Sequence, residues 1–179
     1  MRIISGTAKG RKLKTLAGDD VRPTSDKVKE GIFSAIQFDI QGRRFLDLFA
    51  GSGQMGLEAL SRGAESATFV DASLDSLKVC KENISSLGFE DSSKVIRSDA
   101  LSFLSLCGQM FDIAFLDPPY AAGLLEKALN LVCDKMSDYG IIICEHPSEV
   151  ILPEEIKGFC IYKKYRYGKI NVTTYKKDN

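Results

Sequence analysis

The sequence contains a single histidine, His146, and five cysteines that form no C-x-x-C pair. Structural zinc sites draw four ligands mainly from cysteine and histidine at short spacings. This pattern therefore argues against a metal cluster, and we expect no bound metal. An odd number of widely separated cysteines also argues against a disulfide framework. We interpret the cysteines as reduced and as small, buried apolar side chains.

The sequence also lacks any apolar run near the roughly 18 residues that cross a membrane. Its basic first 14 residues contain no apolar segment of the secretory-signal type. We therefore expect a cytoplasmic protein without a membrane partner. A length of 179 residues suits one domain over residues 1–179, with a basic arm at residues 1–24 and a core at residues 25–179. Such a chain buries enough surface to fold without disulfides or metals, and we expect a monomer.

Net charge is absent too, because 24 basic residues balance 24 acidic ones. The balance hides a division: the net charge is +5 over residues 1–44, −10 over residues 45–160 and +5 over residues 161–179. Basic ends around an acidic middle are typical of an enzyme that holds a polyanion at its periphery. Solvated charged faces would produce the same distribution, so the choice between these two interpretations depends on the motifs of residues 45–160.

Strand and helix patterns alternate along the chain. Apolar runs predict strands at 45–49, 67–70, 94–97, 111–116 and 141–144. Apolar residues at helical spacing predict helices near 28–36, 54–62, 74–87 and 124–136. This order predicts an α/β, Rossmann-like fold with a mostly parallel, doubly wound sheet. We expect a small N-terminal β arm at 2–6 and 11–15, and an antiparallel edge hairpin at 159–165 and 169–175.

A glycine-rich loop, Gly51-Ser-Gly53-Gln-Met-Gly56, follows the first predicted strand and opens a helix. Glycines in that position let the backbone turn sharply and approach a nucleotide closely. Asp71, at the end of the next strand, suits a ribose hydroxyl in a dehydrogenase or in a methyltransferase. Asp47 favours the second, because a carboxylate attracts the ammonium group of S-adenosylmethionine and repels a pyrophosphate. The alternative to a cofactor-binding loop is that these glycines only allow the helix to pack closely on the strand.

Asp99-Ala100 follows the third strand, where the carboxyl edge of the sheet would meet the adenine of a bound nucleoside. Asp99 would accept a hydrogen bond from the exocyclic amine of that adenine. An aspartate in this position is equally typical of an ordinary turn residue. We expect the residues that follow the fourth strand to lie at the same edge of the sheet.

The tetrapeptide Asp117-Pro118-Pro119-Tyr120 continues directly from the fourth strand. Two prolines fix the backbone and remove two donors, so the segment offers acceptors and a ring to a ligand. A nucleobase with an exocyclic amine fits this chemistry: Asp117 and the Pro118 carbonyl would orient the amine, and Tyr120 would stack on the base. The base must be unpaired or flipped out of a helix to enter.

With these motifs the chain resembles the bacterial family that methylates the exocyclic N2 of a guanine in 16S ribosomal RNA, the RNA of the small subunit. The match runs almost from end to end. Its most particular segments are Arg22-Pro-Thr24 and Gly56-Leu-Glu-Ala-Leu-Ser-Arg-Gly-Ala64. The chain departs from the family's pattern at Leu16, where proline is usual, at Gly31, where alanine is usual, and at Gln54-Met55, where Ala-Leu is usual.

The resemblance implies an S-adenosylmethionine-dependent methyltransferase fold and a set of site residues. The cofactor would be bound by Asp47, Phe49, Gly51, Gly53, Asp71, Asp99 and Ala100. The guanine amine would be held by Asp117, Pro118, Pro119 and Tyr120. Ribosomal RNA, within a small-subunit particle, would meet Lys9, Arg11, Lys12, Arg22 and Thr24. Tyrosines and cations of the C-terminal hairpin would add stacking and phosphate contacts, although an ordinary edge hairpin alternates residues in the same way.

Three other functions compete with this one. A DNA adenine-N6 methyltransferase uses the same tetrapeptide chemistry, but only a hairpin remains here to read a DNA sequence. A nicotinamide oxidoreductase needs a substrate domain and a proton-transfer residue. A non-catalytic RNA-binding module would not require an intact Asp117-Pro-Pro-Tyr120 beside an intact glycine loop.

Overall fold

The computed structural model describes residues 1–16, 24–119 and 123–177, and it confirms the α/β architecture. One sheet of eight strands has the order β3-β2-β1-β4-β5-β8-β7-β6. Its parallel part contains β1 (Arg44–Asp47), β2 (Ser66–Asp71), β3 (Ser93–Arg97), β4 (Phe111–Leu116) and β5 (Met136–Pro147). The antiparallel edge contains β6 (Glu155–Ile156), β7 (Phe159–Tyr167) and β8 (Ile170–Lys177). The predicted hairpin is therefore confirmed.

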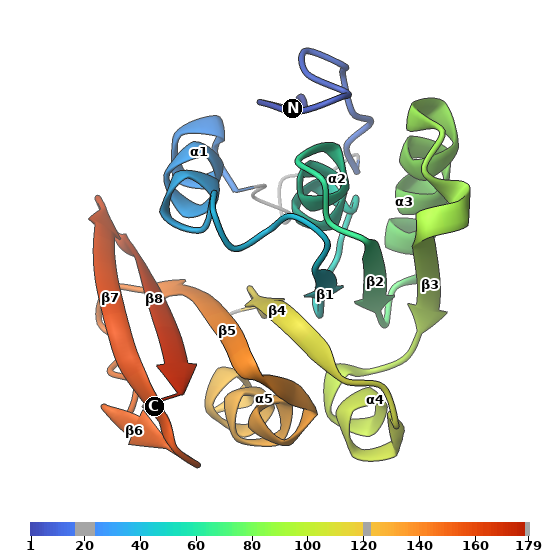
Figure 1. The fold of residues 1–179 in the computed structure, drawn as a ribbon. Helices are drawn as coiled ribbons and strands as arrows, with labels where there is room; N and C mark the ends of the chain where they lie inside the picture. The colour runs from blue at the N-terminus through green and yellow to red at the C-terminus, as the bar shows by residue number, and fades with distance from the viewer. Residues whose placement is uncertain (17–23, 120–122, 178–179) are drawn as a thin grey trace.

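Helices cover both faces of the sheet (Figure 1). One face carries α1 (Asp26–Ala35), α2 (Gln54–Ser61) and α3 (Leu74–Leu87), and the other carries α4 (Ala100–Leu106) and α5 (Leu124–Val132). Two short 3₁₀ helices, η1 (Glu90–Ser92) and η2 (Cys133–Lys135), complete the described elements. Within the described ranges, no helix is long and apolar enough to cross a membrane.

Local signals explain several boundaries. The Ser25 hydroxyl accepts from the Val28 N–H at 3.3 Å and so caps α1. Gly88 ends α3 with a φ of 73°, a left-handed conformation that favours glycine.

Other boundaries differ from the prediction. Helix α4 was not predicted, because seven residues are too few to establish a helical period. Helix α5 ends at Val132 and continues as η2, so the predicted helix to residue 136 was too long. Strand β5 covers 12 residues instead of the four apolar ones. Pairing with β8 continues it to Pro147, and Met136 at its start pairs with Phe111 of β4.

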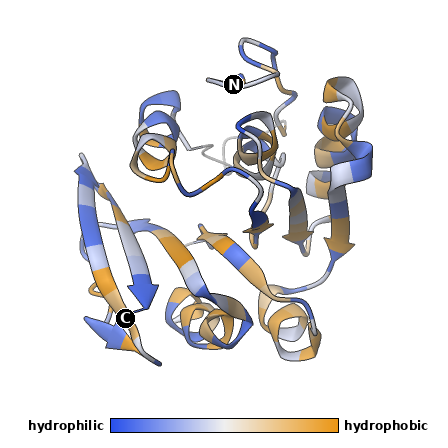
Figure 2. Ribbon diagram, in the orientation of Figure 1, coloured by the Kyte–Doolittle hydropathy of each residue, from blue (hydrophilic) through white to orange (hydrophobic). Residues whose placement is uncertain are grey.

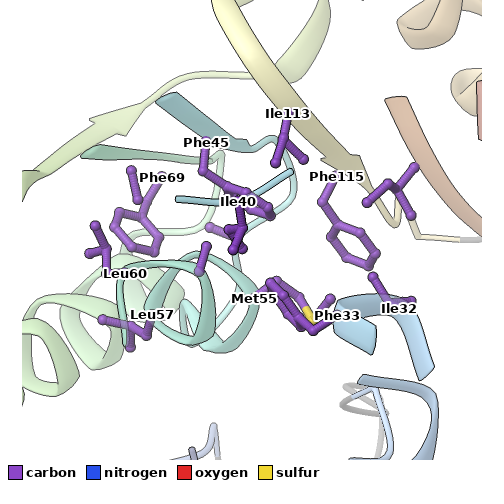
Figure 3. Packing of buried hydrophobic residues seen from close by; sticks show 14 of the residues in the cluster. Ile32, Phe33, Ile40, Phe45, Met55, Leu57, Leu60, Phe69, Ile113 and Phe115 are labelled. Atoms are coloured by element: carbon purple, nitrogen blue, oxygen red, sulfur yellow. The ribbon is translucent and has the colours of Figure 1, made fainter. Parts of the chain in front are cut away.

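The core consists of two clusters, one on each face of the sheet. Figure 2 shows apolar residues concentrated on the central strands and on the helix surfaces that face them. The cluster beneath α1 and α2 includes Phe33 and Phe45, whose ring centroids lie 6.3 Å apart (Figure 3). Phe69 and Phe115 extend this cluster along the sheet.

The N-terminal arm differs from the expected pair of strands. Among the described residues its pairing is one isolated antiparallel bridge between Arg2 and Lys12. Ile3, Ala8 and Leu13 are nevertheless buried in the same cluster as α1 and α2. The basic arm is therefore packed on the core through its apolar residues.

Candidate active site

A cavity of about 810 Å³ lies at the carboxyl ends of the parallel strands. Its walls include residues that directly follow β1, β2, β3 and β4, together with the start of α1 and the tip of the β7–β8 hairpin. The chain leaves β1 toward α2 on one face and leaves β4 toward α5 on the other (Figure 1). Ligand sites of open α/β sheets form at such a divergence, because the departing segments leave a crevice between them.

The glycines of the loop have two different roles: two of them allow close packing, and one leaves space in the cavity. A Cβ atom at Gly53 would lie 2.6 Å from the Cys80 Sγ, and one at Gly56 would lie 2.3 Å from the Phe69 ring. Those two glycines let α2 pack closely. Gly51, with a φ of 53°, lines the cavity and has no atom within 4 Å of a built Cβ, so it leaves room for a ligand. Gly53 is not among the cavity-lining residues.

Asp47 lies beneath this loop and is not among the residues that line the cavity. It is only 1% exposed, and its Oδ2 accepts a hydrogen bond from the Gly56 N–H at 2.9 Å. Burial raises the pKa of the Asp47 carboxyl to about 7, since desolvation opposes its charge. The structure thus places Asp47 where it supports the loop, and, like Gly53, it lies outside the cavity that the other predicted cofactor residues line.

The remaining residues predicted to bind the cofactor line the cavity together: Phe49, Gly51, Asp71, Asp99 and Ala100. Asp71 accepts from the Gly51 N–H and the Ser73 N–H, both at 2.8 Å, and so ties the loop after β1 to the loop after β2. Asp99 caps α4 by accepting from the Ser102 N–H at 2.9 Å. Hydrogen bonds from Ser102 lower the pKa of the Asp99 carboxyl, so this group stays ionised.

Asp117, Pro118 and Pro119 line the same cavity on the side of β4. The pKa of the Asp117 carboxyl is raised to about 8, mainly by burial and also by the charges of Glu145 and Asp47. Perturbed carboxyl groups in clefts are typical of functional sites. Tyr120 lies outside the described residues.

Glu145 is an acidic residue of the cavity that the sequence analysis did not predict. It lies in β5, is 9% exposed, and accepts a hydrogen bond from the Thr24 hydroxyl at 3.0 Å. Thr24, predicted to meet RNA, also lines the cavity. A charged residue directly after the apolar run Ile141–Cys144 was an available signal, because a buried carboxylate is costly unless it has a role.

The predicted RNA-binding cations of the arm lie elsewhere. Lys9, Arg11 and Lys12 are exposed and are not among the residues lining the cavity. The Arg11 guanidinium donates to the Ser86 carbonyl at 2.5 Å, on the end of α3. Arg22 lies outside the described residues.

The hairpin tip reaches the cavity, where Arg166, Tyr167 and Gly168 line one wall. Tyr167 sits against α1 at Gly31: a Cβ atom built on Gly31 would lie 2.0 Å from the Tyr167 hydroxyl. Gly31 therefore provides the space that this tyrosine occupies.

Comparison with known proteins agrees with these features. The family described as conserved hypothetical protein 95 matches residues 1–176. The chain is 43% identical to YlbH of Bacillus subtilis, with 99% of each chain covered. It is 34% identical to ribosomal RNA small subunit methyltransferase D of Escherichia coli, over 99% of this chain and 90% of that protein.

Solved structures show the same fold. YhhF of Escherichia coli superimposes with a TM-score of 0.90 at 35% identity, over 99% of this chain and 98% of the other. A 16S rRNA N2 G1207 methyltransferase of Thermus thermophilus, solved with S-adenosylmethionine and guanosine, superimposes with a TM-score of 0.74. This methyltransferase shares 20% identity with the chain, over 90% of this chain and 45% of that one. At this identity the similarity establishes a common fold and no more.

Proposed function

The chain belongs to the conserved hypothetical protein 95 family, whose relatives include small-subunit rRNA methyltransferases, and we propose that it methylates the exocyclic N2 of a guanine in 16S rRNA. One observation carries the proposal. The cavity lined by Gly51, Asp71 and Asp99 is also lined by Asp117, Pro118 and Pro119. A nucleoside cofactor and an amine-bearing base would therefore meet in one chamber.

S-adenosylmethionine is the cofactor, and it supplies an electrophilic methyl group carried on a sulfonium. The cavity residues fit it in size and chemistry. Gly51 leaves open space where a side chain would block a ligand, and the volume of about 810 Å³ exceeds what a nucleoside alone requires. Asp71 would hold ribose hydroxyls, Asp99 the adenine amine, and Phe49 and Ala100 the apolar surface, while Asp47 would support the loop from below.

The acceptors at the end of β4 would position the substrate amine. The amine nitrogen of guanine donates through two N–H bonds, and the Asp117 carboxylate with the Pro118 carbonyl would accept them. Orientation of this kind contributes to catalysis because aligned reactants avoid the entropic cost of encounter. Asp117 need not take the proton, since methylation itself makes that nitrogen acidic. Tyr120 remains the predicted stacking residue.

The proposal extends to the RNA and its setting. The basic arm and the hairpin tip, which contributes Arg166 and Tyr167 to the cavity wall, would contact phosphates and unpaired bases around the target. The substrate would be 16S rRNA within a small-subunit particle, and the enzyme a cytoplasmic monomer.

A labelling experiment tests the proposed function. The protein is incubated with methyl-labelled S-adenosylmethionine and, separately, with unmodified 16S rRNA, small subunits assembled from that RNA, and duplex DNA. Each product is digested to nucleosides. We expect label in N2-methylguanosine from the RNA or the subunits, and the difference between those two substrates measures the need for ribosomal proteins. Label in N6-methyladenine from DNA would overturn the assignment of the base, and no label would favour a non-catalytic module.

Asp117→Ala tests the part assigned to the tetrapeptide. We expect turnover to fall at least about 100-fold, because the amine loses its orienting acceptor, while cofactor affinity stays within a factor of two or so of the parent value. Asp91→Ala, which removes an exposed aspartate outside the cavity, is the matched control. Equal loss of turnover and of cofactor binding would contradict the role given to Asp117.

A further inference from the structure

Two acidic side chains from neighbouring strands stand together in the cavity. Strands β4 and β5 run parallel in a register that pairs Leu116 with Cys144. The next residue of each strand is acidic, Asp117 on one and Glu145 on the other, and both line the cavity. Adjacent strands lie about 4.8 Å apart, so the two carboxyl groups face one ligand from the same side.

The position of Glu145 is supported from outside the sheet. The Thr24 hydroxyl donates to the Glu145 Oε2 at 3.0 Å, and Thr24 is only 6% exposed. Thr24 directly precedes Ser25, the cap of α1. A hydrogen bond spanning 121 residues thus connects the start of α1 to the middle of the sheet.

The two acidic groups also influence each other electrostatically. The pKa of Asp117 is raised to about 8 mainly by desolvation and partly through the charge of Glu145, because like charges repel. A ligand that brings two adjacent N–H donors would donate to an oxygen of each group at once.

We propose that Glu145, positioned by Thr24, determines the base specificity of the site by accepting the ring N1–H of guanine while Asp117 accepts from the neighbouring N2 amine. The inference rests on the proposed function and deepens it. Guanine carries these two donors side by side. Adenine and cytosine carry a lone pair on the ring nitrogen beside their exocyclic amine, and that lone pair would face the Glu145 carboxylate and be repelled.

The test compares a base that has the N1–H group with one that lacks it, and the Glu145 variant below assigns the difference to that group. Once the methylated guanosine has been located, two RNA substrates are made, one with guanosine and one with 2-aminopurine riboside at that position. The latter keeps the N2 amine but has an acceptor at N1 and no oxygen at C6. We expect the parent enzyme to prefer guanosine by about 10- to 100-fold in kcat/KM, the range for one well-formed base contact. Binding is followed in parallel by the fluorescence of 2-aminopurine in the presence of S-adenosylhomocysteine.

Glu145→Gln provides the second half of the test. Its amide can donate to the N1 acceptor of 2-aminopurine, so we expect the preference for guanosine to fall at least tenfold and 2-aminopurine RNA to bind more tightly than it does to the parent. Thr24→Val should weaken the guanosine preference with Glu145 still present. Glu149→Gln, which alters an exposed glutamate outside the cavity, should leave the preference unchanged.

The outcomes separate this inference from the proposed function. Formation of N2-methylguanosine with equal activity on both RNAs, or a preference that Glu145→Gln leaves intact, overturns the inference alone. Absence of N2-methylguanosine overturns both. Because the decisive quantity is a ratio of two substrates on one enzyme, a general loss of folding would lower both rates and leave the ratio unaltered.

Discussion

Removal of the Glu58 carboxylate should release the N-terminal arm from the core. Glu58 lies in α2 with no exposed surface. Its oxygens accept from the Ile4 N–H at 2.8 Å, the Ser5 N–H at 3.0 Å and the Arg62 Nε at 2.8 Å. Lys29, also fully buried, lies 3.7 Å away and donates to the Arg2 carbonyl at 2.6 Å. One carboxylate therefore joins the arm, α1 and α2.

Glu58→Ala leaves two backbone N–H groups and the Lys29 ammonium without this partner. Burial already lowers the pKa of Lys29, and Glu58 is the main group opposing that shift. Removing one member of a buried ion pair costs about 3–5 kcal/mol. For a chain of this size, each kcal/mol lowers the melting temperature by about 2–4 °C, so we expect a decrease of roughly 6–20 °C.

Urea unfolding followed by circular dichroism measures the loss of stability, and trypsin cleavage after Lys9 and Arg11 measures release of the arm. The matched control is Asp75→Ala, which breaks an exposed pair with Lys78 at 3.4 Å and should cost no more than about 0.5 kcal/mol. A Glu58→Ala protein within about 1 kcal/mol of the parent, or one whose arm is cleaved no faster, would refute the reasoning. Because Met1, Thr15 and Leu16 line the cavity, release of the arm should also weaken cofactor binding.

Two further predictions concern buried groups near the site. The pKa of Asp47 is raised to about 7. The parent protein therefore loses stability as the pH rises from about 4 to 7, by up to about 4 kcal/mol. Asp47→Asn has no group that titrates at this position, so its stability relative to the parent should increase over that pH range. Urea unfolding at pH 4.5 and pH 8 checks this, and an equal difference at both values would contradict it. Gly31→Ala should cost about 1–3 kcal/mol and raise KM for RNA, because its Cβ would displace Tyr167, whereas Gly108→Ala, with no atom within 4 Å of a built Cβ, should be close to neutral; unchanged melting temperature and KM in Gly31→Ala would contradict the assigned packing.

The alternating pattern of the chain was sufficient to predict its layers. Each central strand is a short apolar run because parallel strands are covered on both faces, and the run Phe111–Leu116 is fully buried as expected. Motifs that follow such strands were placed correctly at one sheet edge, because parallel strands share their carboxyl ends. The sequence thus predicted that Gly51, Asp71, Asp99 and Asp117 would line one cavity.

Short or polar segments carried too little local signal. Helix α4 extends over only seven residues, and the arm was predicted as two strands, whereas the bridge from Arg2 to Lys12 is isolated. The arm is held mainly by Glu58 and by burial of Ile3. The residues next to Ile4 do not indicate its hydrogen bond to Glu58, because Glu58 is 54 positions away in the sequence.

What the sequence by itself determined is the order of the five parallel strands and the longer helices, the glycine-rich turn after β1 and the chemistry offered after β4, since each depends on residues within a few positions of one another. Only the tertiary structure decided that Asp47 lies beneath the loop, that Tyr167 occupies the space above Gly31, and that Glu145 stands beside Asp117 with Thr24 as its donor. Those contacts depend on strand order and register, which bring distant residues together through the packing of the whole sheet.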